Sequence, residues 1–162
     1  MRKEDPAGWS DDYSVGIPEI DEQHKTLFEL VNKIHDAISA HQGSAASREV
    51  MDQLVEYTRV HFALEQNLMH TGNFPGYKAH CVLHTNLIDE VVSMQEKINS
   101  GKVAISFELL HFLRNWLSKH ILVEDKQYAR YFNTHGHDQF SNWARRSDEA
   151  MKKQRKKWWK FW

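Results

Sequence analysis

Apolar residues recur every three or four positions along four long segments of the chain. These segments run from about residue 20 to 40, 44 to 69, 77 to 99 and 106 to 132. This spacing is typical of amphipathic helices that each bury one apolar stripe. Short stretches rich in Gly, Pro and Ser separate the segments and are expected to end the helices. The pattern therefore predicts an all-α protein, an up-down-up-down antiparallel four-helix bundle.

The two ends of the chain do not share this pattern. Residues 1–17 contain Pro6, Gly8 and Gly16 and are expected to form an irregular N-terminal arm. A weaker helical pattern runs from 139 to about 157, in a segment rich in basic and aromatic residues. We therefore expect a bundle domain at 1–138 and a basic, Trp-rich C-terminal extension at 139–162.

Every predicted helix has at least one histidine on its apolar stripe. Adjacent helices of such a bundle run in opposite directions, so these histidines are all expected at one end of it. A carboxylate lies on the same stripe, and a buried carboxylate costs several kcal/mol unless it is paired or binds a metal. Histidine is the commonest metal ligand in proteins. The residues predicted to form a metal site are His24, His61, Glu65, His80, His84 and His120.

The fourth helix offers two candidates for a further carboxylate ligand. Glu124 follows His120 by four positions and lies on the same face of a regular helix. Asp125 follows it by five positions and would point about 140° away. A π-bulge, which is frequent at functional sites, would instead bring Asp125 inward. Helix geometry alone favours Glu124.

The remaining histidines fall off the stripes or in turns and are expected in solvent. They are His35, His41, His70, His111, His135 and His137. Only one Glu-x-x-His pair is present, at Glu108 and His111, whereas ferritin-like di-iron bundles need two such pairs. The sequence therefore argues against a ferritin-like centre.

Four stretches resemble the hemerythrin family in its single-domain bacterial form. They read YSVGIPEIDEQHKTL, HFALEQNLM, FPGYKAHCVLH and WLSKHILVEDKQY, within residues 9–132. The resemblance implies two iron ions with a bridging oxo or hydroxo group. It assigns His80, His84 and His120 to one iron, His24 and His61 to the other, and Glu65 and Asp125 as bridges. It thus prefers Asp125 over Glu124. Gln66 stands where many relatives have a second acid.

The same resemblance implies reversible binding of dioxygen. We expect an oxygen carrier or store, or a protein that delivers oxygen to oxygen-requiring enzymes, and not an enzyme itself. The alternatives are an oxygen or redox sensor and a di-iron protein that handles peroxide or nitric oxide. A dry pocket for oxygen should flank the ligands. Its expected lining is Leu27, Phe62, Trp116, Leu117 and Ile121.

Composition and charge indicate where the protein is located and what its tail contacts. No stretch is apolar enough to span a membrane, the start lacks an apolar secretory segment, and one cysteine, Cys81, allows no internal disulfide. We therefore expect a cytoplasmic protein. Residues 145–162 have a net charge of +6 and the rest of the chain −7. The basic aromatic tail is expected to contact a membrane surface or a partner protein, and nucleic acid is not expected.

Overall fold

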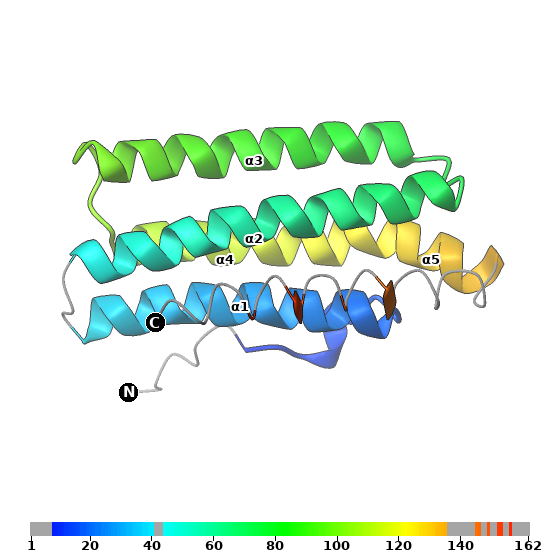
Figure 1. Cartoon of the computed structure of the whole chain (residues 1–162), viewed down its shortest axis with the longest axis horizontal. Helices are drawn as coiled ribbons and strands as arrows, with labels where there is room; N and C mark the ends of the chain where they lie inside the picture. The colour runs from blue at the N-terminus through cyan, green and yellow to red at the C-terminus, as the bar shows by residue number, and fades with distance from the viewer. Residues whose placement is uncertain are drawn as a thin grey trace.

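The fold is a bundle of four helical columns (Figure 1). The computed structural model describes residues 8–40 and 44–135, together with residues 145, 146, 149, 152, 153 and 156. Over the two long ranges the chain forms three long helices and a fourth, composite column. The elements are η1 (Asp11–Tyr13), α1 (Pro18–Ser39), α2 (Ser44–Thr71), α3 (Tyr77–Asn99), α4 (Phe107–Lys119), η2 (His120–Asp125) and α5 (Lys126–His135).

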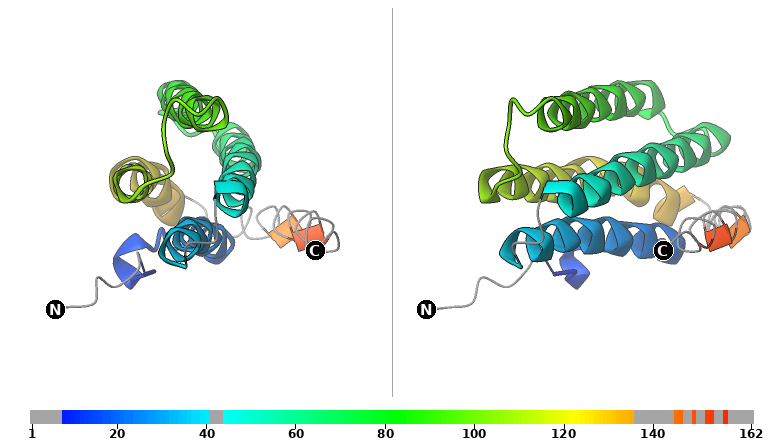
Figure 2. Two further views of the ribbon diagram at one scale, coloured as in Figure 1. Left: turned by 90° about the vertical axis from the view of Figure 1, so that its left-hand side faces the viewer. Right: turned by 60° about the vertical axis from the view of Figure 1, so that its left-hand side comes forward.

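The columns alternate in direction, and α1 packs against both α2 and α4 while α2 packs against α3. The end-on view in Figure 2 shows the four columns at the corners of the bundle. The described ranges contain helices, turns and irregular backbone but no strand. The predicted all-α, up-down-up-down architecture is therefore confirmed.

Local chemistry explains where the helices begin and end. Pro18 occupies the first turn of α1, where its missing N–H leaves no hydrogen bond unmade. The Ser106 hydroxyl accepts a hydrogen bond from the backbone N–H of Leu109 at 3.4 Å and caps α4. After α3 the chain turns at Gly101, whose φ of +74° suits glycine. All three residues are of types that commonly begin or end helices.

The fourth column is one continuous helical run in which a π-helical segment, η2, separates α4 from α5. The sequence predicted a single helix over about 106–132, and the observed run is Phe107 to His135. Because a π-helical turn contains more residues than an α-helical turn, the side chains after η2 point in a different direction about the helix axis than they would in a regular helix. This change decides which side chains of the column face the core.

The described part of the N-terminal arm, residues 8–17, is irregular apart from the short helical turn η1, as predicted. The arm is anchored by aromatic contacts: the Tyr13 ring lies 4.7 Å from the Phe28 ring, and the Trp9 ring lies 6.0 Å from Tyr13. The Tyr13 hydroxyl also forms a 3.1 Å hydrogen bond with the Ser118 hydroxyl of α4. The arm therefore joins α1 to the fourth column.

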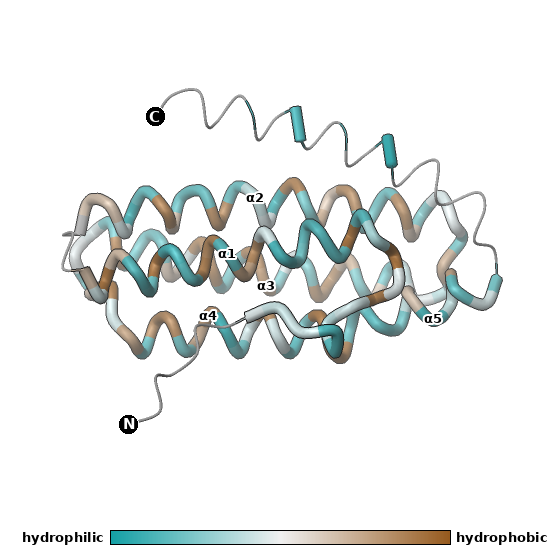
Figure 3. The backbone as a smooth tube through the Cα atoms, turned by 90° about the horizontal axis from the view of Figure 1, so that it is seen from below, coloured by the Kyte–Doolittle hydropathy of each residue, from teal (hydrophilic) through white to brown (hydrophobic). Residues whose placement is uncertain are grey.

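Hydropathy alternates along each helix, as Figure 3 shows, and the apolar side chains fill the interior. None of the described helices is long and apolar enough to cross a membrane. The predicted helix from 139 to 157 and the start of the C-terminal extension lie largely outside the described residues. The division of the chain into 1–138 and 139–162 stays a prediction.

Candidate metal centre

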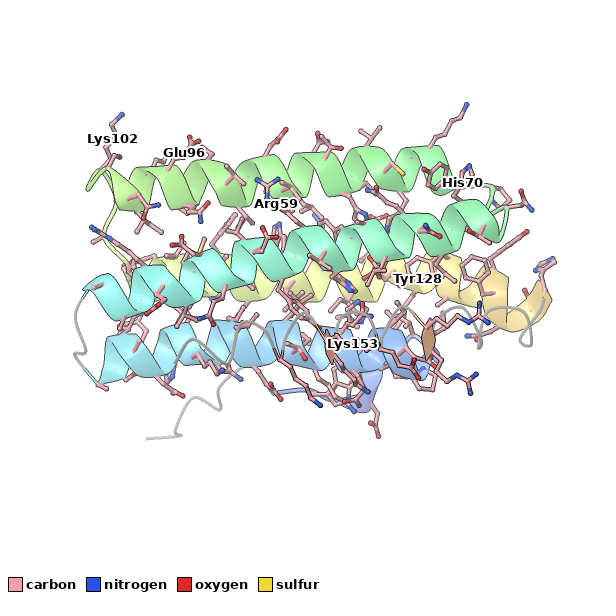
Figure 4. All side chains as sticks on the ribbon, viewed as in Figure 1. Arg59, His70, Glu96, Lys102, Tyr128 and Lys153 are labelled. Carbon is pink, nitrogen blue, oxygen red and sulfur yellow. The ribbon has the colours of Figure 1, made fainter. Side chains whose placement is uncertain are left out.

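The seven predicted ligand residues converge at one end of the bundle, from all four columns. In Figure 4 the labels of Tyr128 and His70 lie toward this end, and Glu96 and Lys102 mark the opposite end. The convergence follows from the alternating directions: the ligands lie early in α1 and α3 and late in α2 and the fourth column. All seven side chains are at most 4 % exposed: His24, His61, Glu65, His80, His84, His120 and Asp125.

The seven residues form two clusters that share both carboxylates. One cluster contains His80, His84 and His120 with Glu65 and Asp125. The other contains His24 and His61 with the same two carboxylates. Within each cluster, the candidate ligand atoms all lie within 4.8 Å of one another. Two metal ions could therefore sit side by side between the helices.

Each carboxylate turns one oxygen toward each cluster. Glu65 Oε2 lies 3.3 Å from His84 Nε2, whereas Oε1 lies 3.4 Å from His61 Nε2 and 3.6 Å from His24 Nε2. Asp125 Oδ1 lies 3.0 Å from His120 Nε2, and Oδ2 lies 3.2 Å from His24 Nε2. This is the arrangement that carboxylates bridging two metal ions require.

The π-helical segment brings Asp125, and not Glu124, into the core. Asp125 is fully buried, while the Glu124 carboxylate is partly exposed and accepts a 3.2 Å hydrogen bond from Gln127 Nε2. In a regular helix the side chain four positions after His120 would face inward. The wider turn of η2 moves that position outward and replaces it with Asp125.

Many buried polar atoms of the two clusters lack a hydrogen bond within the described part of the chain. Buried polar groups are normally hydrogen-bonded, because an unmet partner costs roughly 1–3 kcal/mol. Here the atoms without one are His24 Nδ1 and Nε2, His61 Nε2, Glu65 Oε2, His120 Nδ1, and Asp125 Oδ1 and Oδ2. Of these atoms, His24 Nε2 and His61 Nε2 face the carboxylate oxygens of Glu65 and Asp125. Imidazole nitrogens and carboxylate oxygens together are a donor set that suits a transition metal, so the residues present fit such ions.

In the metal-free site, His24 and His120 compensate the charge of the two carboxylates, because the pKa of each imidazole is raised above its ordinary value. Burial lowers the pKa of His24, but the nearby carboxylates of Asp125 and Glu65 together outweigh burial and raise it to about 9. Burial and the charge of Asp125 both oppose ionisation of Glu65, yet the surrounding imidazoles hold the pKa of Glu65 well below its usual value. Burial lowers the pKa of His61 to about 4. His61 is thus neutral and ready to bind a metal ion. His24 carries a proton that a bound metal ion would displace.

A second layer of polar side chains holds three of the seven residues in place. Gln23 Oε1 lies 2.7 Å from His61 Nδ1, and Gln66 Nε2 lies 3.2 Å from His84 Nδ1. The Tyr128 hydroxyl donates a hydrogen bond to Glu65 Oε1. Burial, with the charges of Glu65 and Asp125, raises the pKa of Tyr128 well above its usual value, so it is a neutral phenol. We call Gln23, Gln66 and Tyr128 the outer layer.

Sequence reasoning missed the roles of Gln23 and Tyr128. Gln23 adjoins His24, and Tyr128 follows Asp125 by three positions, which places each beside a ligand on its helix. Polar or aromatic residues next to buried ligands are the signal that could have found them. Gln66 stands out in the sequence only because relatives have an acid there, and its contact with His84 gives it a structural role.

The side chains expected to line an oxygen pocket are all buried: Leu27, Phe62, Trp116, Leu117 and Ile121. The Phe62 ring stacks on His84 with centroids 3.7 Å apart and lies 5.1 Å from the His120 ring. Trp116 packs behind it, 6.3 Å away. These rings form an apolar wall beside the histidines.

The histidines that were expected in solvent stay outside both clusters wherever they are described. His70, His111 and His135 are exposed. His35 is partly buried instead, since its ring packs 6.0 Å from that of Phe107 and its Nδ1 lies 3.1 Å from Asp36. His41 and His137 lie outside the described residues.

Comparison with known proteins agrees with this geometry. Residues 15–132 match the family model described as the hemerythrin HHE cation binding domain. The chain is 37 % identical to a bacteriohemerythrin of Stenotrophomonas maltophilia over 127 residues, 78 % of this chain and 82 % of that protein. It is 28 % identical to a hemerythrin of Sipunculus nudus, over 76 % and 92 % of the two chains.

A solved structure of wild-type hemerythrin superposes on this chain with a TM-score of 0.71 and 29 % sequence identity. The match covers 75 % of this chain and 94 % of that one. A buried, two-cluster cation site in a four-helix bundle defines the class of protein, and the chain belongs to the hemerythrin family. The family predicted from the sequence motifs is therefore confirmed.

Proposed function

We propose that this protein binds dioxygen reversibly at a pair of iron ions and serves as an oxygen carrier or store. The ligands would be His80, His84 and His120 on one ion and His24 and His61 on the other. Glu65 and Asp125 would bridge them. The observation that carries the proposal is that each carboxylate presents one oxygen to each histidine cluster.

The uneven number of histidines supports binding of a small ligand. Five imidazole nitrogens and four carboxylate oxygens would fill nine of the twelve positions of two octahedral ions. A bridging oxo or hydroxo group would fill two more. The remaining position belongs to the cluster of His24 and His61. Ferrous ions held in the two clusters would each supply one of the two electrons with which oxygen is bound.

The protein's own contribution is a dry site with few negative charges. Neutral imidazoles outnumber the carboxylates, which favours the ferrous state. Leu27, Phe62, Trp116, Leu117 and Ile121 would exclude water from the open position, and water would promote loss of bound oxygen. Leu117→Ala should therefore shorten the lifetime of the oxygenated form. An unchanged lifetime would remove Leu117 from the pocket.

A visible absorption spectrum tests the function directly. The protein is loaded with ferrous iron without air, exposed to oxygen, and then returned to an oxygen-free atmosphere. We expect a band that appears with oxygen and disappears when oxygen is removed, over repeated cycles. A spectrum of oxidised iron that persists after removal would contradict reversible binding and favour a sensor or an enzyme that consumes oxygen, peroxide or nitric oxide.

Substitution of the bridging residues tests the ligand assignment. Glu65→Gln and Asp125→Asn should each weaken iron retention, because one charged bridging oxygen is lost. Glu124→Gln is the matched control, since it changes the neighbouring carboxylate that hydrogen-bonds Gln127. Full iron occupancy in the Glu65 or Asp125 variant, or loss of iron in the Glu124 variant, would overturn the assignment.

We further propose a cytoplasmic location and contact of the tail with an anionic membrane surface. Residues 145–162 carry eight Lys and Arg side chains, two acids, and Trp158, Trp159, Phe161 and Trp162. Basic residues attract anionic lipid, and aromatic rings favour the headgroup region. Flotation with phosphatidylglycerol vesicles tests this. The full chain should float with the vesicles and a chain ending at residue 144 should not, and equal behaviour would remove the membrane proposal.

A further inference from the structure

Tyr128 is a fully buried phenol to which the proposed function assigns no task. It comes from α5, three residues after Asp125, and its side chain has 0 % exposure. Its hydroxyl donates a hydrogen bond to Glu65 Oε1. Oε1 is the oxygen that faces His24 and His61, the cluster with the open position. The phenol therefore acts on the oxygen-binding side of the bridge.

The ring of Tyr128 is held so that the hydroxyl has a fixed direction. The His80 ring lies 5.6 Å away, nearly perpendicular to it, and the Phe132 ring lies 6.0 Å away. Because the side chain is fully buried, a small rotation of the ring cannot replace its hydrogen bond to Glu65 with one to water. The hydrogen bond is therefore a built-in feature of the centre.

We propose that Tyr128 is a positioning residue that sets the reduction potential of the iron pair through Glu65, and so slows autoxidation of the oxygenated form. The inference rests on the proposed function. A donor on a metal-binding carboxylate draws negative charge away from the metal. Ferric iron depends more on that charge than ferrous iron does. The hydrogen bond should therefore favour the ferrous state that oxygen needs.

The test compares two variants that each remove one phenolic hydroxyl from the same helix. Tyr128→Phe removes the donor to Glu65. Tyr131→Phe is the matched control, because that hydroxyl donates to the backbone oxygen of Asn73 at 3.2 Å and lies away from the ligands. Both full-length proteins are loaded with iron. The midpoint potential is measured by spectroelectrochemistry, and autoxidation by the decay of the oxygenated band.

We expect Tyr128→Phe to retain two irons per chain and to favour the oxidised state about tenfold, which is about 59 mV for one electron. Autoxidation should be about tenfold faster, and Tyr131→Phe should match the wild type. An unchanged potential in Tyr128→Phe would overturn the proposal and leave Tyr128 a packing residue. A reversible wild type with an unchanged variant refutes this inference alone, whereas an irreversible wild type refutes the proposed function.

A second variant covers the case in which Tyr128→Phe fails to fold or loses iron. Replacing Tyr128 with 3-fluorotyrosine keeps the ring and the hydroxyl but makes the phenol a stronger hydrogen-bond donor. The potential should then rise and autoxidation should slow, the opposite of the phenylalanine result. A potential equal to that of the wild type would again overturn the proposal.

Discussion

The two halves of the bundle core are equally buried but are built from opposite chemistry. One half, near the α1–α2 and α3–α4 connections, is filled by apolar side chains such as Ile34, Met51, Leu54, Ile98 and Leu113, all at most 1 % exposed. The other half contains the seven candidate ligands and the outer layer. Burial alone therefore does not describe this core, because the two halves contribute to stability in different ways.

The apolar half stabilises the fold by removing hydrocarbon from water, about 25 cal/mol per Å². The polar half loses hydration of two carboxylates and five imidazoles, and in the metal-free chain it recovers only part of that through mutual contacts. The apolar half should therefore maintain the fold, while the polar half determines what binds.

Leu54→Ala should lower the free energy of unfolding by about 2 to 5 kcal/mol, because it opens a cavity in the apolar half. Leu54 has 0 % exposure and precedes Glu65 by about three turns of α2. Denaturant unfolding measures the loss, and metal analysis should still find the wild-type iron content. A variant that keeps its stability but loses iron would contradict the division.

The metal-free protein should lose up to about 3 kcal/mol of stability as pH rises from 6.5 through 9. The folded-state pKa of His24 is raised above the unfolded value of 6.5 to about 9. Its contribution is thus complete below pH 6.5 and disappears as pH rises through 9. Urea unfolding at several pH values measures this dependence.

Two comparisons isolate the contribution of His24. His24→Asn should reduce the loss of stability as pH rises from 6.5 to 9. A remainder should persist from His120, whose pKa the charge of Asp125 also raises despite burial. The iron-loaded protein should lack this loss, since a metal replaces the proton of His24. A metal-free wild type whose stability does not change over this range would show that His24 is not protonated in the folded state.

The helices were predictable because helical periodicity is local and repeats many times in each segment. The third helix was expected at 77–99 and is Tyr77–Asn99; the first was expected at about 20–40 and is Pro18–Ser39. The convergence of the histidines was equally predictable, since short connections force neighbouring helices to alternate in direction. Both inferences depend on sequence spacing, which the chain itself displays.

Residues whose placement depends on one irregular turn or on a distant partner were not predictable from spacing. Regular helix geometry favoured Glu124, and only the family resemblance preferred Asp125, because the position of a π-turn leaves no mark in hydropathy. Tyr128 and Gln23 act through contacts with α2, 63 and 38 residues away in the chain. Such contacts appear only when the helices have been assembled.

Gln23→Leu should weaken cation binding about 10- to 100-fold, at the cluster of His24 and His61. It removes the amide oxygen that fixes the orientation of His61. Gln66→Leu should instead weaken the cluster that contains His84. Anaerobic titration with ferrous iron against a chelator resolves the two steps. If both variants weaken the same metal-binding step equally, Gln23 and Gln66 do not each support a separate cluster.

The smallest expected effects come from two glycines that share a φ of +74° but lie at opposite ends of the bundle. Alanine at Gly101, beside the apolar half, meets no atom within 4 Å and should cost about 1 kcal/mol from backbone strain alone. Alanine at Gly16, in the arm, would place its Cβ 3.0 Å from Asn133 Nδ2, whose amide donates to Val15 O at 3.3 Å.

Gly16→Ala should therefore destabilise the metal-free protein more than Gly101→Ala, because Asn133 must also move. Denaturant unfolding of both variants gives the difference between their free energies of unfolding. The backbone strain that the two variants share cancels in this difference. The remainder measures how firmly the arm is joined to α5, the helix that carries Tyr128. Equal losses would mean that Asn133 yields freely and that the arm adds little rigidity to the polar half.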